Sequence, residues 1–152
     1  YHTWSHEYKT DLKIFHSSQF IKELIDKGKI SFKDKKIKIT YHDPCDLGRA
    51  SKVYEAPREV LRSIPGVELV EMEGNRDQCK CCGGGGNLEM VDPELSAALA
   101  QAKIKEIQAT GADTVVTSCQ QCLRTIMTTA RRKKIPVTAM DITEFILKNM
   151  KE

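Results

Sequence analysis

The stretch DPELSAALAQAKIKEIQATGADTVVTSC (residues 92–119) predicts a helix that leads directly into a strand. Asp92 is a suitable N-cap, Pro93 fits a first helical turn, and Gly111 is suitable to end the helix. Its apolar stripe is expected to consist of Leu95, Leu99, Ala102 and Ile107. The run of residues 113–119 is short and rich in β-branched residues, as expected of a buried strand. A helix next to such a strand is typical of a βαβ unit, in which helices connect parallel strands.

Strand and helix patterns alternate along the rest of the chain. Runs of β-branched residues predict strands, and apolar residues at helical spacing predict helices. The expected strands cover residues 35–42, 66–73, 113–119 and 135–141. The expected helices cover residues 56–64, 92–111, 120–134 and 142–150. The alternation predicts an α/β fold with a small, mainly parallel sheet of about four strands and helices on its flanks.

The first 34 residues differ in character from the rest of the chain. We expect residues 1–34 to be a helical extension or the remnant of a preceding region, followed by the main domain at residues 35–152. One amphipathic helix is expected there, with an apolar face of Phe20, Ile21, Leu24 and Ile25. The chain begins YHTWSHEYK without a methionine, so we expect it to be part of a longer protein. His2 and His6 have helical spacing but no acidic third ligand, and a metal role is not expected of them.

The composition is that of an ordinary globular domain. The 152 residues are 40% hydrophobic and 30% charged, which suffices for one substantial core. The net charge of +3 is too small to indicate nucleic-acid binding. No apolar run approaches the roughly 18–20 residues of a membrane-spanning helix, and no secretory signal is present. We therefore expect a cytoplasmic domain with no nucleic-acid partner and no direct membrane insertion.

All six cysteines lie just beyond the carboxyl ends of expected strands. One follows the first strand, three follow the second, and two lie where the third strand meets the next helix. In an open parallel sheet these ends share one edge, where ligands and cofactors bind. We therefore expect three loops to direct their thiolates toward a common point. In chain order the cysteines are Cys45, Cys79, Cys81, Cys82, Cys119 and Cys122.

Clustered cysteines in such a fold favour metal binding or catalysis over a disulfide framework. Disulfide scaffolds usually spread their cysteines through a short, loop-rich chain. The thiolate is the form that binds metals, and a helix N-terminus lowers the pKa of a thiol because it favours negative charge. Cys119 and Cys122 stand at such an N-terminus. Their C-x-x-C spacing lets both sulfurs bind one ion or cluster.

Four glycines, Gly83–Gly86, follow the cysteine pair in QCKCCGGGGNLEM (residues 78–90). A phosphate-binding loop is not expected, because neither the Gly-Lys-Ser/Thr sequence nor the dinucleotide fingerprint is present. One remaining interpretation is a merely flexible loop. The other, which we favour, is a backbone that approaches sulfur closely and points amide N–H groups at a sulfur-bound metal. Gly83 and Gly84 would lie next to the ligands.

The cysteine pattern resembles that of the cysteine-rich CCG domain of heterodisulfide reductase catalytic subunits. The pattern here is C-x35-CC-G-x35-C-x-x-C, supported by YHDPCDLGR, PREVLRSIPGVELVEM, CCGGGG and GADTVVTSCQQC over about residues 35–125. The same domain occurs in the iron–sulfur subunits of glycolate oxidase, anaerobic glycerol-3-phosphate dehydrogenase and lactate-utilisation systems. Proteins of this family usually carry two such domains, and this chain resembles the C-terminal one.

The resemblance implies a noncubane [4Fe–4S] cluster in residues 35–152 and an oxidoreductase that acts on disulfides or thiols. The implied ligands are Cys45, Cys81, Cys82, Cys119 and Cys122, with no catalytic residue assigned beyond them. The cluster would bind a substrate sulfur and deliver electrons one at a time. The implied partners are other subunits of a redox complex, namely ferredoxin-like, flavin or membrane cytochrome subunits, and the last would associate the chain with a membrane.

Two alternatives stay open at this point. One is an electron-transfer subunit of a flavin-linked dehydrogenase of the glycolate, lactate or glycerol-3-phosphate type, whose substrate chemistry occurs elsewhere. The other is a structural zinc domain that docks partner subunits. Four thiolates satisfy tetrahedral zinc, which would leave the fifth motif cysteine spare.

This chain departs from the family pattern at two positions. Many members have histidine after the first motif cysteine, where this chain has Asp46; we expect altered hydrogen bonding to sulfur or altered proton supply. Cys79 is an additional thiol that the motif does not require. It is a substrate-side thiol, a redox partner of Cys81 or an inert loop residue. His42 and Asp43 precede Cys45 and are expected either to support the ligands or to form ordinary caps at the strand end.

Overall fold

The computed structural model describes residues 13–151 and contains one sheet of four parallel strands. The strands are β1 (Ile37–His42), β2 (Val67–Leu69), β3 (Thr114–Thr117) and β4 (Thr138–Asp141). Their order across the sheet is β2-β1-β3-β4. The predicted α/β fold is therefore confirmed. His2 and His6 lie outside the described residues.

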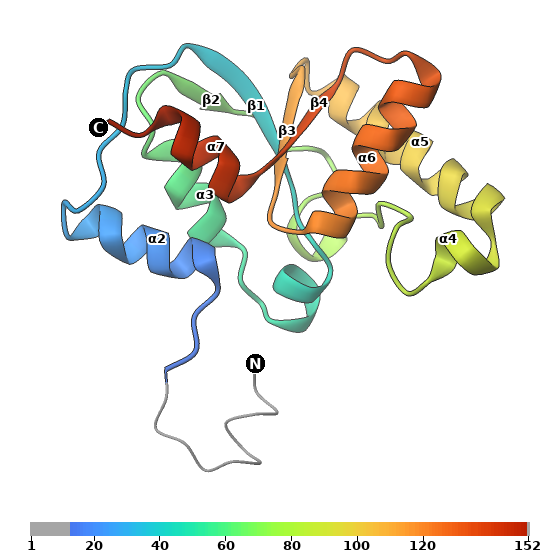
Figure 1. Ribbon diagram of the computed structural model, residues 1–152, viewed down its shortest axis with the longest axis horizontal. Coiled ribbons are helices and arrows are strands. Elements are labelled where there is room, and N and C mark those ends of the chain that lie inside the picture. Colours follow the sequence, from blue (N-terminus) through green and yellow to red (C-terminus); the bar gives the residue numbers. More distant parts are fainter. Residues whose placement is uncertain (1–12, 152) are drawn as a thin grey trace.

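Helices cover both faces of the sheet (Figure 1). One face carries α2 (Ser17–Asp26), α3 (Glu55–Arg62) and α7 (Ile142–Asn149), and the other carries α5 (Pro93–Ala109) and α6 (Gln120–Lys133). Three short elements that the sequence did not predict are the π-helical turn η1 (Asp46–Ala50), the 3-10 turn η2 (Arg76–Gln78) and the helix α4 (Leu88–Val91). The first two follow β1 and β2, so they lie in the loops that carry cysteines.

Strand residues alternate between two apolar cores, because successive side chains point to opposite faces of a sheet. Ile39 of β1 and Val116 of β3 belong to the first core, with residues of α3 and α7. Val115 of β3 belongs to the second core, between the sheet and the helices α5 and α6. Cys82 and Cys122 also belong to this second core. Two of the cysteines are therefore held in place by apolar packing.

The strands are shorter than the sequence suggested. β2 has three residues instead of the expected 66–73, because it is an edge strand that pairs only with β1, from Ile37 with Val67 to Ile39 with Leu69. β4 begins at Thr138 instead of residue 135, because the backbone turns just before it, where the Val137 N–H donates to the Ile135 carbonyl. The early end of β2 leaves room for its loop at the carboxyl edge.

The predicted apolar stripe of α5 was wrong at Leu95 and Ala102, whereas Ile107 is buried and Leu99 is partly buried. Leu95 is 47% exposed and Ala102 is also exposed. The residues that face the sheet are Ser96, Ala100, Lys103, Ile104 and Ile107. Two polar side chains belong to this inner face because each finds a partner there, which the apolar pattern alone does not reveal.

The expected helix in the first 34 residues forms as α2, which contacts α3. Ile21 and Ile25 pack against the first core, whereas Phe20 is 52% exposed. Phe32 belongs to the same core and forms a bridge with Met150. The domain boundary between residues 34 and 35 stays a prediction.

Candidate metal centre

All six cysteines line one pocket at the carboxyl edge of the sheet. The cavity volume of the pocket is about 80 Å³, several times the roughly 10–15 Å³ that one water molecule needs. All six lie within the described residues, and all are free thiols. The other residues that line the pocket are His42, Asp43, Asp46, Arg49, Lys80, Gly85 and Gln121. The structure thus brings together the cysteine sulfurs of all three loops.

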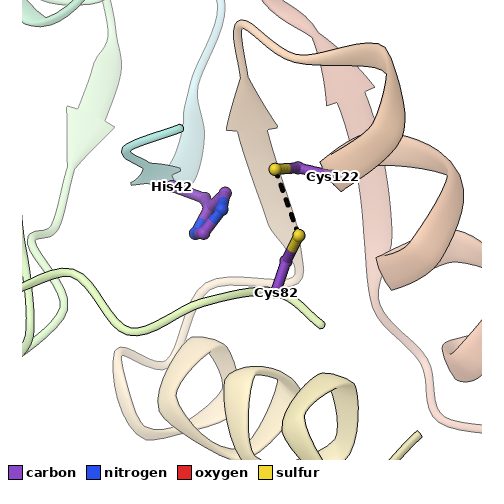
Figure 2. A group of neighbouring side chains, drawn as sticks. All are labelled: His42, Cys82 and Cys122. Atoms are coloured by element: carbon purple, nitrogen blue, oxygen red, sulfur yellow. Dashed lines mark hydrogen bonds between the residues drawn. The ribbon is translucent and has the colours of Figure 1, made fainter. Parts of the chain in front are cut away.

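The innermost part of the pocket consists of His42, Cys82 and Cys122 (Figure 2). Their ligand atoms all lie within 4.8 Å of one another, and the two sulfurs are 3.2 Å apart and hydrogen-bonded. His42 is the last residue of β1, and Cys122 lies in the first turn of α6. All three side chains are at most 5% exposed. Donor atoms brought so close together can bind one metal ion or one cluster.

The two cysteines at the start of α6 have pKa values that are shifted in opposite directions. The contact with Cys122 lowers the pKa of Cys119 to about 6 against the effect of burial, with help from the backbone N–H groups of Cys122 and Gln121. The pKa of Cys122 is instead raised, because this thiol contacts Cys119 and Cys82 and is buried. The expected lowering is thus found for Cys119 and was wrong for Cys122. The reason is that contact among the sulfurs favours the thiolate of Cys119 and the protonated thiol of Cys122.

His42 favours the negative charge on Cys82, and Cys82 favours the positive charge on His42. The contact with Cys122 lowers the pKa of Cys82 to about 4, against burial and with the help of His42. For His42, burial opposes the charge, but contacts with Cys79 and Cys82 outweigh it and raise the pKa to about 9. The lowered pKa of Cys82 favours the anionic form of this sulfur, which is the form that metals bind.

Cys45 and Cys81 are the exposed members of the group. Burial raises the pKa of Cys45, and the charge of the adjacent Asp46 raises it further, while the Asp46 backbone N–H lowers it. Cys81 accepts a hydrogen bond from the Gly83 N–H at 3.3 Å. These two thiols face solvent, whereas Cys82 and Cys122 face the core.

Gly83 and Gly84 pass closely between α5 and α6. Gly83 has a φ of +84°, and a Cβ built on it would lie 2.4 Å from the Ser96 carbonyl oxygen. A Cβ on Gly84 would lie 2.1 Å from Oγ1 of Thr125 in α6. The favoured interpretation of the glycines thus needs an addition: beyond the amide contact with sulfur, they let the cysteine loop enter between two helices.

Cys79 is buried and lies beside two nitrogen atoms. Its Sγ is 3.5 Å from Nδ1 of His42 and 3.6 Å from Nζ of Lys103. Burial raises its pKa, but the contacts with His42 and Lys103 outweigh burial and lower it. Sequence reasoning did not single out Lys103, although it follows Ser96 and Ala100 at helical spacing on the inner face of α5.

A buried ion network lies behind the pocket and joins its loops. The Arg58 guanidinium donates to both carboxylate oxygens of Asp43 at 2.7 Å and to those of Glu71 at 2.7 and 2.9 Å. It also donates to the Tyr54 carbonyl at 2.9 Å. Asp43 accepts a further hydrogen bond from the Arg76 backbone N–H. Asp43 therefore supports the loops after β1 and β2, and the sequence did not indicate its partner Arg58.

The donor set fits an iron–sulfur cluster or zinc. Thiolates are soft ligands that select zinc and iron–sulfur clusters, and a backbone N–H beside sulfur is a feature that tunes such clusters. Both features occur in this pocket. The sulfurs of Cys82 and Cys122 lie in contact, and the Gly83 N–H donates to the Cys81 sulfur. The five cysteines of the motif line the same pocket.

Comparison with known proteins agrees with this chemistry. The family model described as "Cysteine-rich domain" (CCG) matches residues 39–127. One subunit of the dihydromethanophenazine:CoB--CoM heterodisulfide reductase of Methanosarcina mazei is 36% identical over 135 residues, 88% of this chain and 33% of that protein. The chain thus spans about a third of the length of this relative. The relative is named as a subunit, which indicates an assembly.

Two further relatives carry other names. The probable membrane-anchored ferredoxin of Chromohalobacter salexigens is 40% identical over 113 residues, 74% of this chain and 17% of that protein. The probable iron-sulfur-binding oxidoreductase FadF of Bacillus subtilis is 33% identical over 141 residues, 91% of this chain and 20% of that protein. Between residues 13 and 151, no helix is long and apolar enough to cross a membrane. The family match and the named relatives together support an iron–sulfur redox domain, and the chain belongs to the cysteine-rich CCG domain family.

Proposed function

We propose that this chain is the cluster-binding domain of a heterodisulfide reductase-like oxidoreductase that acts on a disulfide or thiol. The observation that carries the proposal is the single pocket lined by all six cysteines. In this proposal Cys45, Cys81, Cys82, Cys119 and Cys122 hold a noncubane [4Fe–4S] cluster. The name of the Methanosarcina relative supports a disulfide as the substrate class. Residues 35–152 would then be one domain of a larger catalytic subunit.

The five proposed ligands divide by burial into an inner and an outer set. Cys82 and Cys122 are buried and would hold the core side of the group, with Cys119 at the N-terminus of α6. Cys45 and Cys81 are exposed and would hold the side from which a substrate sulfur approaches. When bound, an iron–sulfur cluster supplies one-electron steps to that sulfur. The Gly83 N–H and His42 orient and stabilise the thiolates Cys81 and Cys82.

Metal content is the first test of this proposal. The chain is produced without oxygen, supplied with iron and sulfide, and analysed by mass spectrometry and electron paramagnetic resonance. We expect about four irons per chain, lost in Cys82→Ser and Cys81→Ser. Cys79→Ala serves as the matched control and is expected to keep its iron. One zinc and no iron in the wild-type chain would contradict the proposal.

Two other functions have specific support. The inner group of His42, Cys82 and Cys122, with Cys119 nearby, also suits a tetrahedral zinc site in a docking domain. The relatives named ferredoxin and iron-sulfur-binding oxidoreductase favour electron transfer with the substrate chemistry on another subunit. A bound cluster whose spectrum changes on adding a thiol or disulfide supports the disulfide reaction. A cluster that responds only to a redox partner supports electron transfer.

The same proposal includes the partner subunits of the chain and its location in the cell. As part of a redox complex it would contact ferredoxin-like, flavin or membrane cytochrome subunits. The location we propose is cytoplasmic, with membrane association through a partner subunit. Co-purification of the full-length protein with its subunits, before and after membrane solubilisation, would test both points.

A further inference from the structure

Lys103 is a lysine in the protein core, and its position calls for a physical reason. Its side chain is fully buried, at the inner face of α5. A buried ammonium is costly unless it is paired, so an apolar residue would ordinarily occupy this site. The nearest anionic partner is Glu106, whose carboxylate lies 2.6 Å from the Lys103 Nζ.

Glu106 does not fully neutralise this lysine, because it pairs with a second one. Its other oxygen lies 2.7 Å from Nζ of Lys80, which is 72% exposed. One carboxylate therefore serves two ammonium groups. The positive charge that is left over lies beside the Cys79 sulfur, 3.6 Å from the Lys103 Nζ.

Cys79 connects this charge to the metal centre. It lines the pocket together with the five motif cysteines, and its Sγ is 3.5 Å from His42 Nδ1. His42 in turn belongs to the inner group with Cys82 and Cys122. A continuous set of contacts thus runs from the ammonium to the sulfurs.

We propose that Lys103 is a positioning residue of the sulfur pocket: its ammonium donates a hydrogen bond that holds the Cys79 sulfur in the pocket wall, and so places one positive charge beside the metal centre. The effect of this charge on a bound cluster rests on the proposed function. Local charge is one of the factors that set the reduction potential of an iron–sulfur cluster, and a positive charge stabilises the more reduced, more negative state. Lys103 therefore makes the reduction potential of the bound cluster more positive.

The first test uses the metal-free chain under reducing conditions. Lys103→Met keeps most of the length of the side chain and removes its charge, and Glu106 retains Lys80 as a partner, so the variant is expected to fold. Cys79→Ala should lower the urea midpoint by less in the Lys103→Met background than in the wild type. In the background of Lys105→Met, an exposed position on the same helix, it should lower the midpoint as it does in the wild type. Equal losses in all three backgrounds would overturn the proposed Lys103–Cys79 contact.

The second test uses the chain loaded with iron and sulfide. At equal iron content, Lys103→Met should shift the midpoint potential to a more negative value, Lys103→Arg should restore it, and Lys105→Met should leave it unchanged. Identical potentials in Lys103→Met and Lys105→Met would overturn the inference. A wild-type chain that takes up no iron contradicts the proposed function instead, and the metal-free cycle then decides for or against the Lys103–Cys79 pair.

Discussion

At the scale of single residues, the pocket depends on buried charges and on glycines near the cysteines. Arg58 uses all of its guanidinium nitrogens in hydrogen bonds to Asp43, Glu71 and Tyr54. Gly84 has no room for a side chain beside Thr125. Neither residue binds a metal in our proposal, and both determine where the cysteine loops lie.

Replacing Arg58 should destabilise the fold strongly. Arg58→Met leaves the Asp43 carboxylate buried without its partner, and breaking a buried ion pair in this way costs about 3–5 kcal/mol. Arg62→Met on the same helix is the control: Arg62 is 50% exposed and its closest carboxylate is 3.4 Å away, so a loss below about 1 kcal/mol is expected. Urea unfolding measures both values. Similar stability of the two variants would show that the network contributes little.

The glycines offer a matched pair of alanine substitutions. Gly84→Ala should cost about 1–3 kcal/mol, because its Cβ would overlap Oγ1 of Thr125. Gly85→Ala meets nothing within 4 Å and should change the stability by less than about 1 kcal/mol. Thr125→Ala should recover part of the loss in Gly84→Ala, since it removes the overlapping oxygen. The free energies of unfolding of the three variants and the double variant decide the matter, and equal losses at positions 84 and 85 would refute the packing argument.

At the scale of elements, three helices each begin at a residue whose side chain accepts a backbone N–H of the first turn. The Asp92 carboxylate accepts the Leu95 N–H at the start of α5, as the sequence predicted. Asp141 does the same for Thr143 at the start of α7. In α2 the cap is His16, whose Nδ1 accepts the Ser18 N–H at 3.1 Å. A histidine cap makes the stability of this element depend on pH.

The contribution of His16 should be lost in mild acid. Burial lowers its pKa below the ordinary value of 6.5, and the charge of Asp141 only partly offsets this. The folded state therefore favours the neutral ring, so the contribution is complete above pH 6.5 and declines as the pH falls through the lowered pKa. His16→Asn keeps a capping oxygen and does not titrate. Unfolding from about pH 7.5 to pH 5 should show a steeper decline in the wild type, and parallel curves would contradict this origin.

At the scale of the whole molecule, three loops that follow different strands meet at one edge of the sheet. Cys45 follows β1, Cys79, Cys81 and Cys82 lie between β2 and α4, and Cys119 and Cys122 lie at the junction of β3 and α6. A metal bound there would connect parts of the chain that are far apart in sequence. Binding to the folded state alone raises its stability by mass action.

Loading with metal should therefore raise the melting temperature. Saturation at about a thousand times the dissociation constant contributes about 4 kcal/mol, or a shift of roughly 10 °C for a chain of this size. Removing the metal with a chelator should reverse the shift. Cys82→Ser should abolish the shift, and Cys79→Ala should keep it. Scanning calorimetry without oxygen measures it, and an undiminished shift in Cys82→Ser would exclude Cys82 as a ligand.

Much of the fold and part of the centre could be predicted from local patterns. The strands and long helices were expected close to their observed positions, because periodicity and capping residues report on neighbours in sequence. The turn η1, the short helix α4 and the inner face of α5 were not predicted. The buried partners Arg58 and Lys103 were missed as well, because their reasons for burial lie on other elements. The ligand roles of the motif cysteines stay a prediction.

The sequence by itself determined the α/β class, the placement of cysteines after strands and the family, since these depend on order and spacing along the chain. Only the tertiary structure decided which side chains share the pocket wall. It placed Cys79 between His42 and Lys103, paired Arg58 with Asp43, and put Gly84 against Thr125. The physical reason is that burial and charge pairing depend on residues that meet only when the sheet and its helices pack together.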